Sequence, residues 1–266
     1  MPVYAQGSGL VEGPQVKILT LDIETSPSLA YVWKLWKENI PLARLIDTGE
    51  VLCVAAKWHH EDTVMFYSVH HDGKQEMVNA IYNLLSEADV VVHYNGKKFD
   101  MPHLNREFIL NGMTPPAPYQ QVDLYWTIRK QFNFTSNKLD HVAQELGLGA
   151  KFEHAGFDLW IKCMNDDDEA WEEMKTYNVQ DVLLTEKLYD RLLPWIAPHP
   201  TASLFSDPEA RAAGVPQCPN CAGTNLKPRG RAYTSVSIFQ RYRCDDCGKW
   251  SRSGSRLEGV TVRNVS

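Results

Sequence analysis

The sequence contains no long apolar run. Its longest strongly apolar stretches, such as Val51–Ala56, have the length of a single strand, whereas a helix that crosses a membrane needs about 20 apolar residues in succession. The first nine residues also lack the basic start and the apolar segment of a secretory signal. These absences argue against a membrane-spanning protein, and we expect a cytoplasmic protein without a membrane partner.

Cysteine is scarce outside one region of the chain. There are six cysteines, of which four form two Cys-x-x-Cys pairs close to the C-terminus. The two others, Cys53 and Cys163, stand alone, and we expect each to be a small residue of the core. Because disulfides are rare in cytosolic proteins, the paired cysteines predict a metal site instead.

Acidic residues outnumber basic ones, but they are unevenly distributed. Residues 214–266 hold nine Lys and Arg against three Asp and Glu, a net charge of +6, so the other residues carry −12 within the total of −6. An acidic body is suited to hold cations, and a basic segment is suited to bind a polyanion. The alternative is that the asymmetry only promotes solubility.

Hydrophobic periodicity predicts an α/β domain. Strands come first, and helices alternate with a further strand after them, which indicates a mixed sheet flanked by helices. Residues 29–45 predict an irregular or helical insertion, and the proline-rich residues 194–216 predict a linker. The predicted strands are 17–24, 51–58, 63–69 and 89–93, and the predicted helices are 75–88, 101–110, 124–132, 138–146 and 166–193.

Two carboxylates stand close together on the first predicted strand. Asp22 and Glu24 follow an apolar run and are two residues apart, so their side chains point to the same face of the strand. Two anions this close repel each other, and one would normally be protonated. A bound divalent cation removes the repulsion, and carboxylate oxygens suit Mg²⁺ or Mn²⁺. The pair therefore predicts a metal site.

Further acids occur where they could complete this site. Asp100 follows a buried strand and a glycine-containing turn, a common place for a functional side chain. The alternative, which does not exclude ligation, is that Asp100 caps the helix that begins with Met101 and Pro102. Tyr177 and Asp181 are four residues apart and share one face of a predicted helix. Tyr177 alone would suit a core position with a hydrated hydroxyl.

Together these residues form three motifs, Asp-x-Glu, Asp and Tyr-x-x-x-Asp. The segments 22–25, 95–100 and 177–181 resemble the three exonuclease motifs of the DEDD superfamily, and the tyrosine is typical of its DEDDy branch. The chain most resembles the proofreading 3′–5′ exonuclease domain of B-family DNA polymerases, and the helical segment 139–147 shares this resemblance. The resemblance covers residues 16–195. Because no polymerase module follows, it implies a stand-alone nuclease.

The resemblance implies an RNase H-like fold and phosphodiester hydrolysis with two Mg²⁺ or Mn²⁺ ions about 4 Å apart. By resemblance, Asp22 bridges both ions. Glu24 and Asp181 complete the site of the ion that activates water, and Asp100 supports the ion that stabilises the leaving 3′ oxygen. Tyr177 would orient the attacking water together with Glu24.

The resemblance also implies contacts with the substrate. Thr25, Asn95 and Phe99 match family positions that touch the terminal nucleotides, although Phe99 would equally suit the core. Many relatives have Ser or Thr followed by Leu at the start of the helix between the second and third motifs. This chain has Asn137–Leu139 there, so we expect Lys138 to contact a phosphate instead.

The cysteine pairs at 218–221 and 244–247 predict one structural Zn²⁺, because each pair presents two thiolates to one tetrahedral ion. An iron–sulfur centre and unpaired thiols are the alternatives. Gly223 and Gly248 stand just after the pairs and predict tight turns, and the alternating residues 232–243 predict the strands of a zinc ribbon. The four predicted ligands are Cys218, Cys221, Cys244 and Cys247.

The predicted ribbon mixes basic and aromatic residues, a combination that binds phosphates and stacks on bases of single-stranded nucleic acid. We expect Arg241 and Arg243 to contact the substrate. The alternatives are a surface that docks a replication or repair protein, and solvated charges around a minimal core.

The expected organisation is a flexible tail (1–15), an exonuclease domain (16–195), a linker (196–215), a zinc ribbon (216–252) and a C-terminal tail (253–266). The leading hypothesis is a metal-dependent 3′–5′ exonuclease that acts on single-stranded DNA or frayed 3′ ends. A 3′–5′ exoribonuclease is the second hypothesis, since this chemistry works on both sugars. The third is a non-catalytic adaptor that uses the ribbon to bind nucleic acid or a partner.

Overall fold

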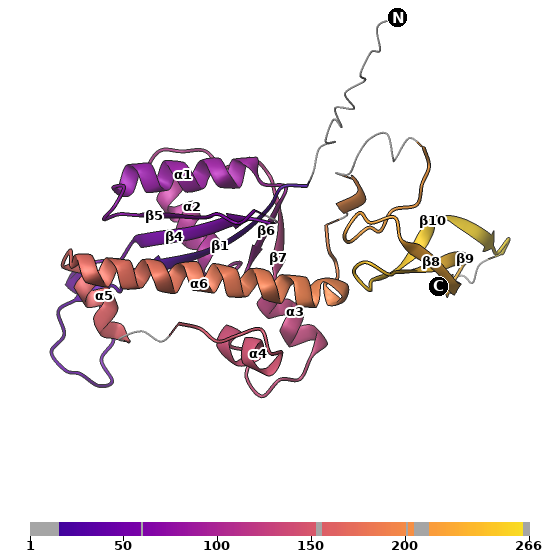
Figure 1. Ribbon diagram of the computed structural model, residues 1–266. Helices are drawn as coiled ribbons and strands as arrows, with labels where there is room; N and C mark the ends of the chain where they lie inside the picture. The colour runs from indigo at the N-terminus through magenta and orange to yellow at the C-terminus, as the bar shows by residue number, and fades with distance from the viewer. Residues whose placement is uncertain (1–15, 60, 153–155, 201, 205–212, 263–266) are drawn as a thin grey trace, which may run out of the picture. The chain divides into compact units, whose positions relative to one another are not determined.

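The computed structural model describes residues 16–59, 61–152, 156–200, 202–204 and 213–262 (Figure 1). Lys17–Leu192 forms one compact unit, and the described residues from Leu193 onward belong to a second unit. The tail predicted at 1–15 lies outside the described residues, as do parts of the predicted linker and of the predicted C-terminal tail. Within the described residues, no helix combines the length and the apolar character needed to cross a bilayer.

A mixed sheet forms the centre of the first unit, which confirms the predicted fold class. Its strand order is β5-β4-β1-β6-β7. β4 runs antiparallel to β1 and β5, whereas β6 runs parallel to β1 and β7 runs parallel to β6. The strands are β1 (Ile18–Thr25), β4 (Val51–Trp58), β5 (Val64–Ser68), β6 (Val90–His93) and β7 (Gln120–Asp123).

Helices cover both faces of this sheet, with α1 and α2 on one face and α6 on the other (Figure 1). Leu19, Leu21 and Ile23 of β1 are buried in one cluster with residues of α1 and α2. Burial of each such side chain stabilises the fold by about 1.5–3 kcal/mol, so apolar packing fixes the position of β1 in the sheet. The helices of this unit are α1 (Lys74–Glu87), α2 (Asp100–Leu110), α3 (Leu124–Gln131), α4 (Leu139–Glu145), α5 (Phe157–Met164) and α6 (Asp168–Leu192).

A second cluster of buried side chains lies between the sheet, α5 and α6. Trp171 and Met174 of α6 pack there with Cys53 of β4 and Cys163 of α5. Both cysteines are buried, as expected for small core residues. α6 runs unbroken over 25 residues, so one side of this helix can reach the whole width of the sheet.

The segment 29–45, expected to be irregular or helical, contains two short strands. β2 (Leu29–Ala30) pairs antiparallel with β3 (Leu45–Asp47), and the 3-10 helix η1 (Leu42–Arg44) directly precedes β3. We call residues 31–44, which connect these strands, the arm. In Figure 1 the arm is the indigo loop at the lower left of the first unit.

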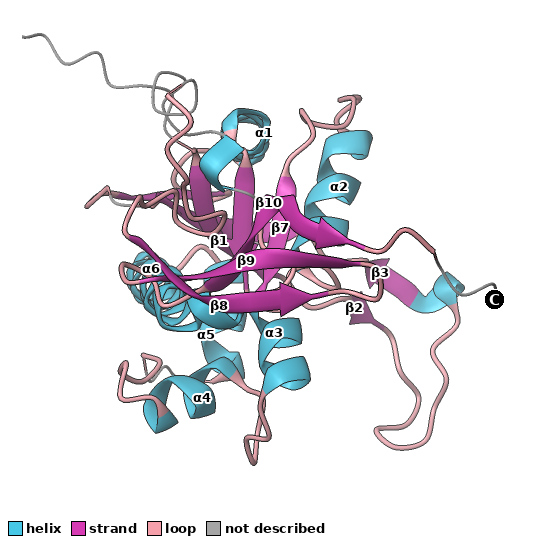
Figure 2. Ribbon diagram, turned by 90° about the vertical axis from the view of Figure 1, so that its right-hand side faces the viewer, coloured by secondary structure: helices cyan, strands magenta, loops and turns pink. Residues whose placement is uncertain are grey.

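The second unit contains a sheet of order β10-β9-β8, in which both pairs are antiparallel (Figure 2). The stretch 232–243, expected to be β-prone, is divided by a turn around Thr234–Val236, so it contributes to two strands. β10 continues to Gly259, beyond residue 252. The elements are the 3-10 helices η2 (Leu193–Trp195) and η3 (Ala202–Leu204) and the strands β8 (Leu226–Tyr233), β9 (Ser237–Cys244) and β10 (Trp250–Gly259).

Candidate active site

Three carboxylates meet where β1 crosses α6. The apolar residues of β1 face α1 and α2, so the alternate residues Asp22 and Glu24 face α6, which contributes Asp181. One oxygen from each of these residues lies within 4.8 Å of one from each of the others. Asn178 of α6 donates a hydrogen bond to Asp22 Oδ2 over 2.8 Å, which holds that carboxylate in place.

Asp100, the fourth predicted acid, is the first residue of α2 and not its N-cap. The N-cap position belongs to Phe99, whose side chain makes no capping hydrogen bond. The buried Asp100 carboxylate instead accepts a hydrogen bond from the backbone N–H of Ile23 over 3.2 Å. Because Ile23 stands between Asp22 and Glu24, this contact holds Asp100 against the strand that carries the other acids.

The four acids oppose one another's ionisation. Burial, followed by the charges of Asp100, Glu24 and Asp181, raises the pKa of Asp22 well above its usual range. Burial and the charge of Asp181 raise the pKa of Glu24 to about 8, and burial raises the pKa of Asp100 to about 7. A divalent cation would remove this repulsion, and carboxylate oxygens suit Mg²⁺ or Mn²⁺. The donor set therefore fits such an ion.

Tyr177 lies one turn before Asp181 on α6. Its ring packs edge-on against Trp160 of α5, with 6.0 Å between the ring centres. Burial, followed by the charges of Glu24 and Asp181, raises the pKa of Tyr177 above its usual range. The phenol is therefore protonated at neutral pH, and its ring belongs to the core between the sheet and the helices.

A lysine that the sequence analysis does not single out lies over these groups. Lys151 forms an ion pair with Asp181 and donates a hydrogen bond to Tyr177 Oη over 3.2 Å. Its backbone N–H donates to Asp140 Oδ1 over 2.8 Å, which fixes the segment after α4. Burial opposes the charge of Lys151, but the charges of Asp181 and Tyr177 raise its pKa above the usual value. A cation thus already lies beside the acids.

The turn after β6 is organised by Asp123, a second residue missed by the sequence analysis. Asn95 has a φ of 65°, and its backbone N–H donates to Asp123 Oδ1 over 3.0 Å. The backbone N–H of Lys97 donates to Asp123 Oδ2 over 3.3 Å. Next to Asn95, any Cβ on Gly96 would lie 2.5 Å from the ring of His93. The turn is therefore closed to most other residues at this position.

A cleft of about 490 Å³ opens beside Asp22. Asn95 and Lys138, two of the predicted substrate contacts, line it together with Lys151. The predicted contacts Thr25 and Phe99 are not among its lining residues. The Phe99 ring is 40% exposed and lies 4.8 Å from that of His103, so the core alternative for Phe99 is wrong.

Residues 45–193 match the model of the RNase H superfamily. This match covers more than half of the chain. The chain belongs to the RNase H superfamily. The matched residues include Asp100, Tyr177 and Asp181, and they begin after β1, which carries Asp22 and Glu24.

One solved structure has a similar fold. The chain is similar to the family B DNA polymerase from the hyperthermophilic archaeon Pyrobaculum calidifontis, with a TM-score of 0.52 and 17% sequence identity. The similarity covers 84% of this chain and 32% of the polymerase, so the chain spans about a third of that protein. At this identity the likeness concerns the fold. No curated protein matches the sequence.

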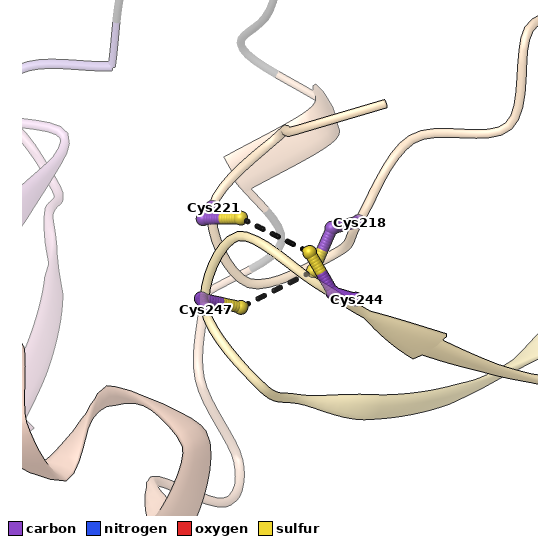
Figure 3. A group of neighbouring side chains, drawn as sticks. All are labelled: Cys218, Cys221, Cys244 and Cys247. Carbon is purple, nitrogen blue, oxygen red and sulfur yellow. Dashed lines mark hydrogen bonds between the residues drawn. The ribbon is translucent and has the colours of Figure 1, made fainter. Parts of the chain in front are cut away.

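Beyond the residues matched to the RNase H superfamily, four cysteine side chains converge (Figure 3). One sulfur from each lies within 4.8 Å of the others. Cys218 Sγ is 3.7 Å from Cys247 Sγ, and Cys221 Sγ is 3.7 Å from Cys244 Sγ. A tetrahedral zinc ion with Zn–S bonds of about 2.3 Å places its sulfurs about 3.8 Å apart. The cluster is therefore compatible with the expected zinc ribbon.

The turns that follow the cysteine pairs differ from each other. Gly248 has a φ of 77°, as expected for a glycine in a tight turn. After the first pair, however, Ala222 takes the left-handed conformation, with a φ of 59°. A Cβ on Gly223 would lie 2.1 Å from Asp246 Oδ2, so another residue there would require the exposed Asp246 side chain to move.

Basic residues of the ribbon gather on one side of its sheet. Strand pairing places Arg243 between Lys227 and Trp250, and Arg252 opposite Arg241. Residues paired in this way project to the same face. The guanidinium of Arg241 lies 5.1 Å from the centre of the Trp250 ring. The two predicted substrate contacts, Arg241 and Arg243, thus share a face with other basic and aromatic side chains.

Proposed function

We propose that this RNase H superfamily protein is a metal-dependent 3′–5′ exonuclease of the DEDDy type that hydrolyses single-stranded DNA or frayed 3′ ends. The observation that carries the proposal is the convergence of Asp22, Glu24 and Asp181, from two distant parts of the chain, on one point. A DNA polymerase among the similar structures supports DNA as the substrate class. Asp100 and Tyr177 complete the set of side chains that the DEDDy chemistry needs.

Carboxylates would hold the metal ions. Asp22, Glu24 and Asp181 suit one ion, and Asp22 and Asp100 suit a second. When bound, two Mg²⁺ or Mn²⁺ ions activate the attacking water and stabilise the oxygen that leaves. Asn178 keeps Asp22 in the required orientation through its hydrogen bond of 2.8 Å.

The protein's own groups would position the water. The Tyr177 hydroxyl is protonated, because its pKa is raised by burial and by the charges of Glu24 and Asp181. It can therefore donate a hydrogen bond to the water oxygen while Glu24 accepts a hydrogen bond from the water. These two contacts would orient the water toward the scissile phosphate. Lys151 would position the Tyr177 hydroxyl, because it donates a hydrogen bond to Tyr177 Oη and forms an ion pair with Asp181 one turn further along α6.

The substrate would enter through the cleft beside Asp22. Asn95 and Lys138 line that cleft and are suited to contact the sugar and phosphates of the terminal nucleotides. Thr25 and Phe99 would border the same nucleotides. The basic face of the ribbon, including Arg241 and Arg243, would bind the strand elsewhere, and a replication or repair protein is the alternative partner for that face.

Digestion of a 5′-labelled single strand tests the proposal. In Mg²⁺ or Mn²⁺, we expect a ladder of labelled DNA products that shortens from the 3′ end, because the resemblance to DEDDy exonucleases implies this direction. A matched RNA strand serves as the comparison. Preferred cleavage of RNA would make the enzyme an exoribonuclease. Binding without cleavage of either strand would instead support the adaptor hypothesis and contradict the proposal.

Lys151→Met should slow the reaction without weakening metal binding. Loss of a residue that positions catalytic groups costs activity by about 10–100-fold, so we expect kcat on the labelled strand to fall by this amount. Removing a cation next to three carboxylates also favours a bound metal ion, so half-maximal activity should need less Mn²⁺. Lys162→Met, at an exposed position of α5, is the matched control. An unchanged kcat would contradict a positioning role for Lys151.

A further inference from the structure

The arm exposes large apolar side chains to an unusual degree. Trp33 is 84% exposed and Trp36 is 83% exposed, whereas each of the other tryptophans of the first unit is at most 37% exposed. Several large apolar side chains exposed on one short segment often mark a binding site. The other exposed apolar residues of the arm are Tyr31, Val32, Leu35, Ile40 and Leu42.

The arm keeps this exposed shape through polar contacts. One carboxylate oxygen of Glu38 accepts hydrogen bonds from the backbone N–H groups of Trp33, over 3.0 Å, and Lys34, over 2.8 Å. The other oxygen of Glu38 forms an ion pair with Arg44. The backbone N–H of Tyr31 donates to Arg44 O over 3.0 Å at the start of the arm. The tryptophans therefore extend from a turn with a defined conformation.

The base of the arm is joined to the elements that carry the acids. Ser26, directly after β1, and Glu50, directly before β4, exchange two hydrogen bonds of 2.9 Å and 2.8 Å. Arg106 of α2 donates to Gly49 O and to Thr48 Oγ1, each over 2.8 Å. β1 carries Asp22 and Glu24, and α2 begins at Asp100. The arm thus starts at the same edge of the fold as the candidate active site.

The charges of the arm suit a polyanion. Each tryptophan of the arm is followed by a lysine, in the pairs Trp33–Lys34 and Trp36–Lys37. Neither lysine forms an ion pair with a residue that the structure describes. The first unit as a whole is acidic, with 17 Lys and Arg against 27 Asp and Glu in residues 17–192. A negatively charged strand would be repelled by this body, so a basic arm beside the acids provides local attraction.

We infer that the arm is a platform for the single-stranded part of the substrate, with Trp33 and Trp36 stacked on unpaired bases and Lys34 and Lys37 on phosphates. This inference rests on the proposed exonuclease function and extends it. Alternating aromatic and basic side chains are the combination by which proteins hold single strands without regard to sequence. A protein partner is the less suitable occupant. Binding of a protein would use the leucines of the arm as much as its tryptophans, and it would not explain why a lysine follows each tryptophan.

The test uses variants of the full-length protein and compares two substrates, a single-stranded oligonucleotide and a small nucleotide ester. Stacking on one base is worth a factor of about ten or more in affinity, so Trp33→Ala and Trp36→Ala should each weaken binding of a labelled single-stranded oligonucleotide by about this factor. Binding is measured by fluorescence anisotropy in the Asp22→Asn background, which prevents digestion. With Asp22 intact, KM for the oligonucleotide should rise while kcat stays unchanged. Trp→Phe at either position should restore most of the affinity.

Hydrolysis of the p-nitrophenyl ester of thymidine 5′-monophosphate separates the arm from the active site. This ester has no strand for the arm to hold, so both alanine variants should hydrolyse it at the wild-type rate. Leu35→Ala and Leu42→Ala are matched controls within the arm and should bind the oligonucleotide as the wild type does.

Several outcomes would overturn the inference. If both tryptophan variants bound the oligonucleotide with wild-type affinity, the arm would not be a binding platform. Hydrolysis of the ester would in that case still support the exonuclease proposal. Loss of self-association in the leucine variants, with binding of DNA unchanged in all variants, would assign the arm to contact with a second copy of the chain. If the wild type hydrolysed neither substrate, the proposed function would fail, and the binding data would still show whether the tryptophans hold DNA.

Discussion

Asp22→Asn should abolish phosphodiester hydrolysis and, in the absence of metal, raise the stability of the protein. Asp22 takes part in both proposed metal sites, and its carboxylate is one of three that lie within 4.8 Å. An amide of the same shape retains the fold but loses the charge that holds a cation. We expect the rate on a 5′-labelled strand to fall by about 10³-fold or more, since single contacts that act on developing charge are worth this much.

The gain in stability follows from the pKa values. The pKa of Asp22 is raised well above its usual range, mainly by burial, and the pKa of Glu24 is raised to about 8. Folded protein therefore binds these protons more tightly than the unfolded chain does. The stability that these two groups contribute to the metal-free protein is fully present below their unfolded pKa values of about 4 and is lost as the pH rises through about 8. Removing one of the repelling charges reduces this loss.

Thermal unfolding in EDTA measures this effect. At pH 8 the melting temperature of Asp22→Asn should exceed that of the wild type by roughly 5 °C, and the difference should shrink at pH 5.5. Adding Mn²⁺ should stabilise the wild type more than the variant. Asp140→Asn is a useful contrast, because a backbone hydrogen bond from Lys151 lowers the pKa of Asp140 and the variant should gain no stability. Equal melting temperatures of wild type and Asp22→Asn at pH 8 would contradict repulsion among the acids.

Removing zinc should unfold the ribbon and leave the first unit folded. Within the described strands β8–β10, Cys244 is the only buried residue, so the sheet has almost no apolar core. A small module of this kind depends on its metal for stability. We therefore expect one zinc per chain by elemental analysis. Strong chelators, or Cys244→Ser, should make the ribbon sensitive to proteases while the segment 17–192 resists them.

Two controls sharpen this experiment. Cys163→Ser changes a buried cysteine of the first unit that lies outside the Cys₄ cluster, so the zinc content should remain at one per chain. Hydrolysis of the small thymidine ester should survive loss of the ribbon, because the acids all belong to the other unit. A ribbon that resisted proteases equally well with and without zinc would contradict a structural role for the ion. If elemental analysis found iron in place of zinc, the identity of the metal would change, but the ribbon would still depend on a bound metal for its folding.

Those parts of the site that depend on short spacing could be predicted from the sequence. Asp22 and Glu24 are two residues apart on a strand, and Tyr177 and Asp181 are four apart on a helix, so local geometry alone places each pair on one face. The four cysteines follow the same logic. The RNase H superfamily fold and the mixed sheet were likewise predicted correctly.

What depends on distant contacts could not be predicted. Lys151 lies in a segment without periodicity, and only the folded chain brings it to Tyr177 and Asp181, which are 26 and 30 residues away. β7 has the sequence Gln-Gln-Val-Asp, which lacks the apolar alternation of a strand, and it forms because β6 offers a parallel edge. Residues 29–45 predicted an irregular or helical insertion, and nothing in their spacing indicated that two tryptophans would be exposed, because hydrating apolar surface is usually unfavourable.

β1 is flanked by a strand on each side, β4 along its length and β6 at its start. A strand in this position can exchange its amide protons only when much of the sheet opens. Asp22 and Glu24 continue this strand and pair with Ala55 and Cys53 of β4, so we expect the strand that carries them to open slowly. Protein that has lost its metal ions would therefore keep the acidic side chains close together. It could bind a cation again without refolding.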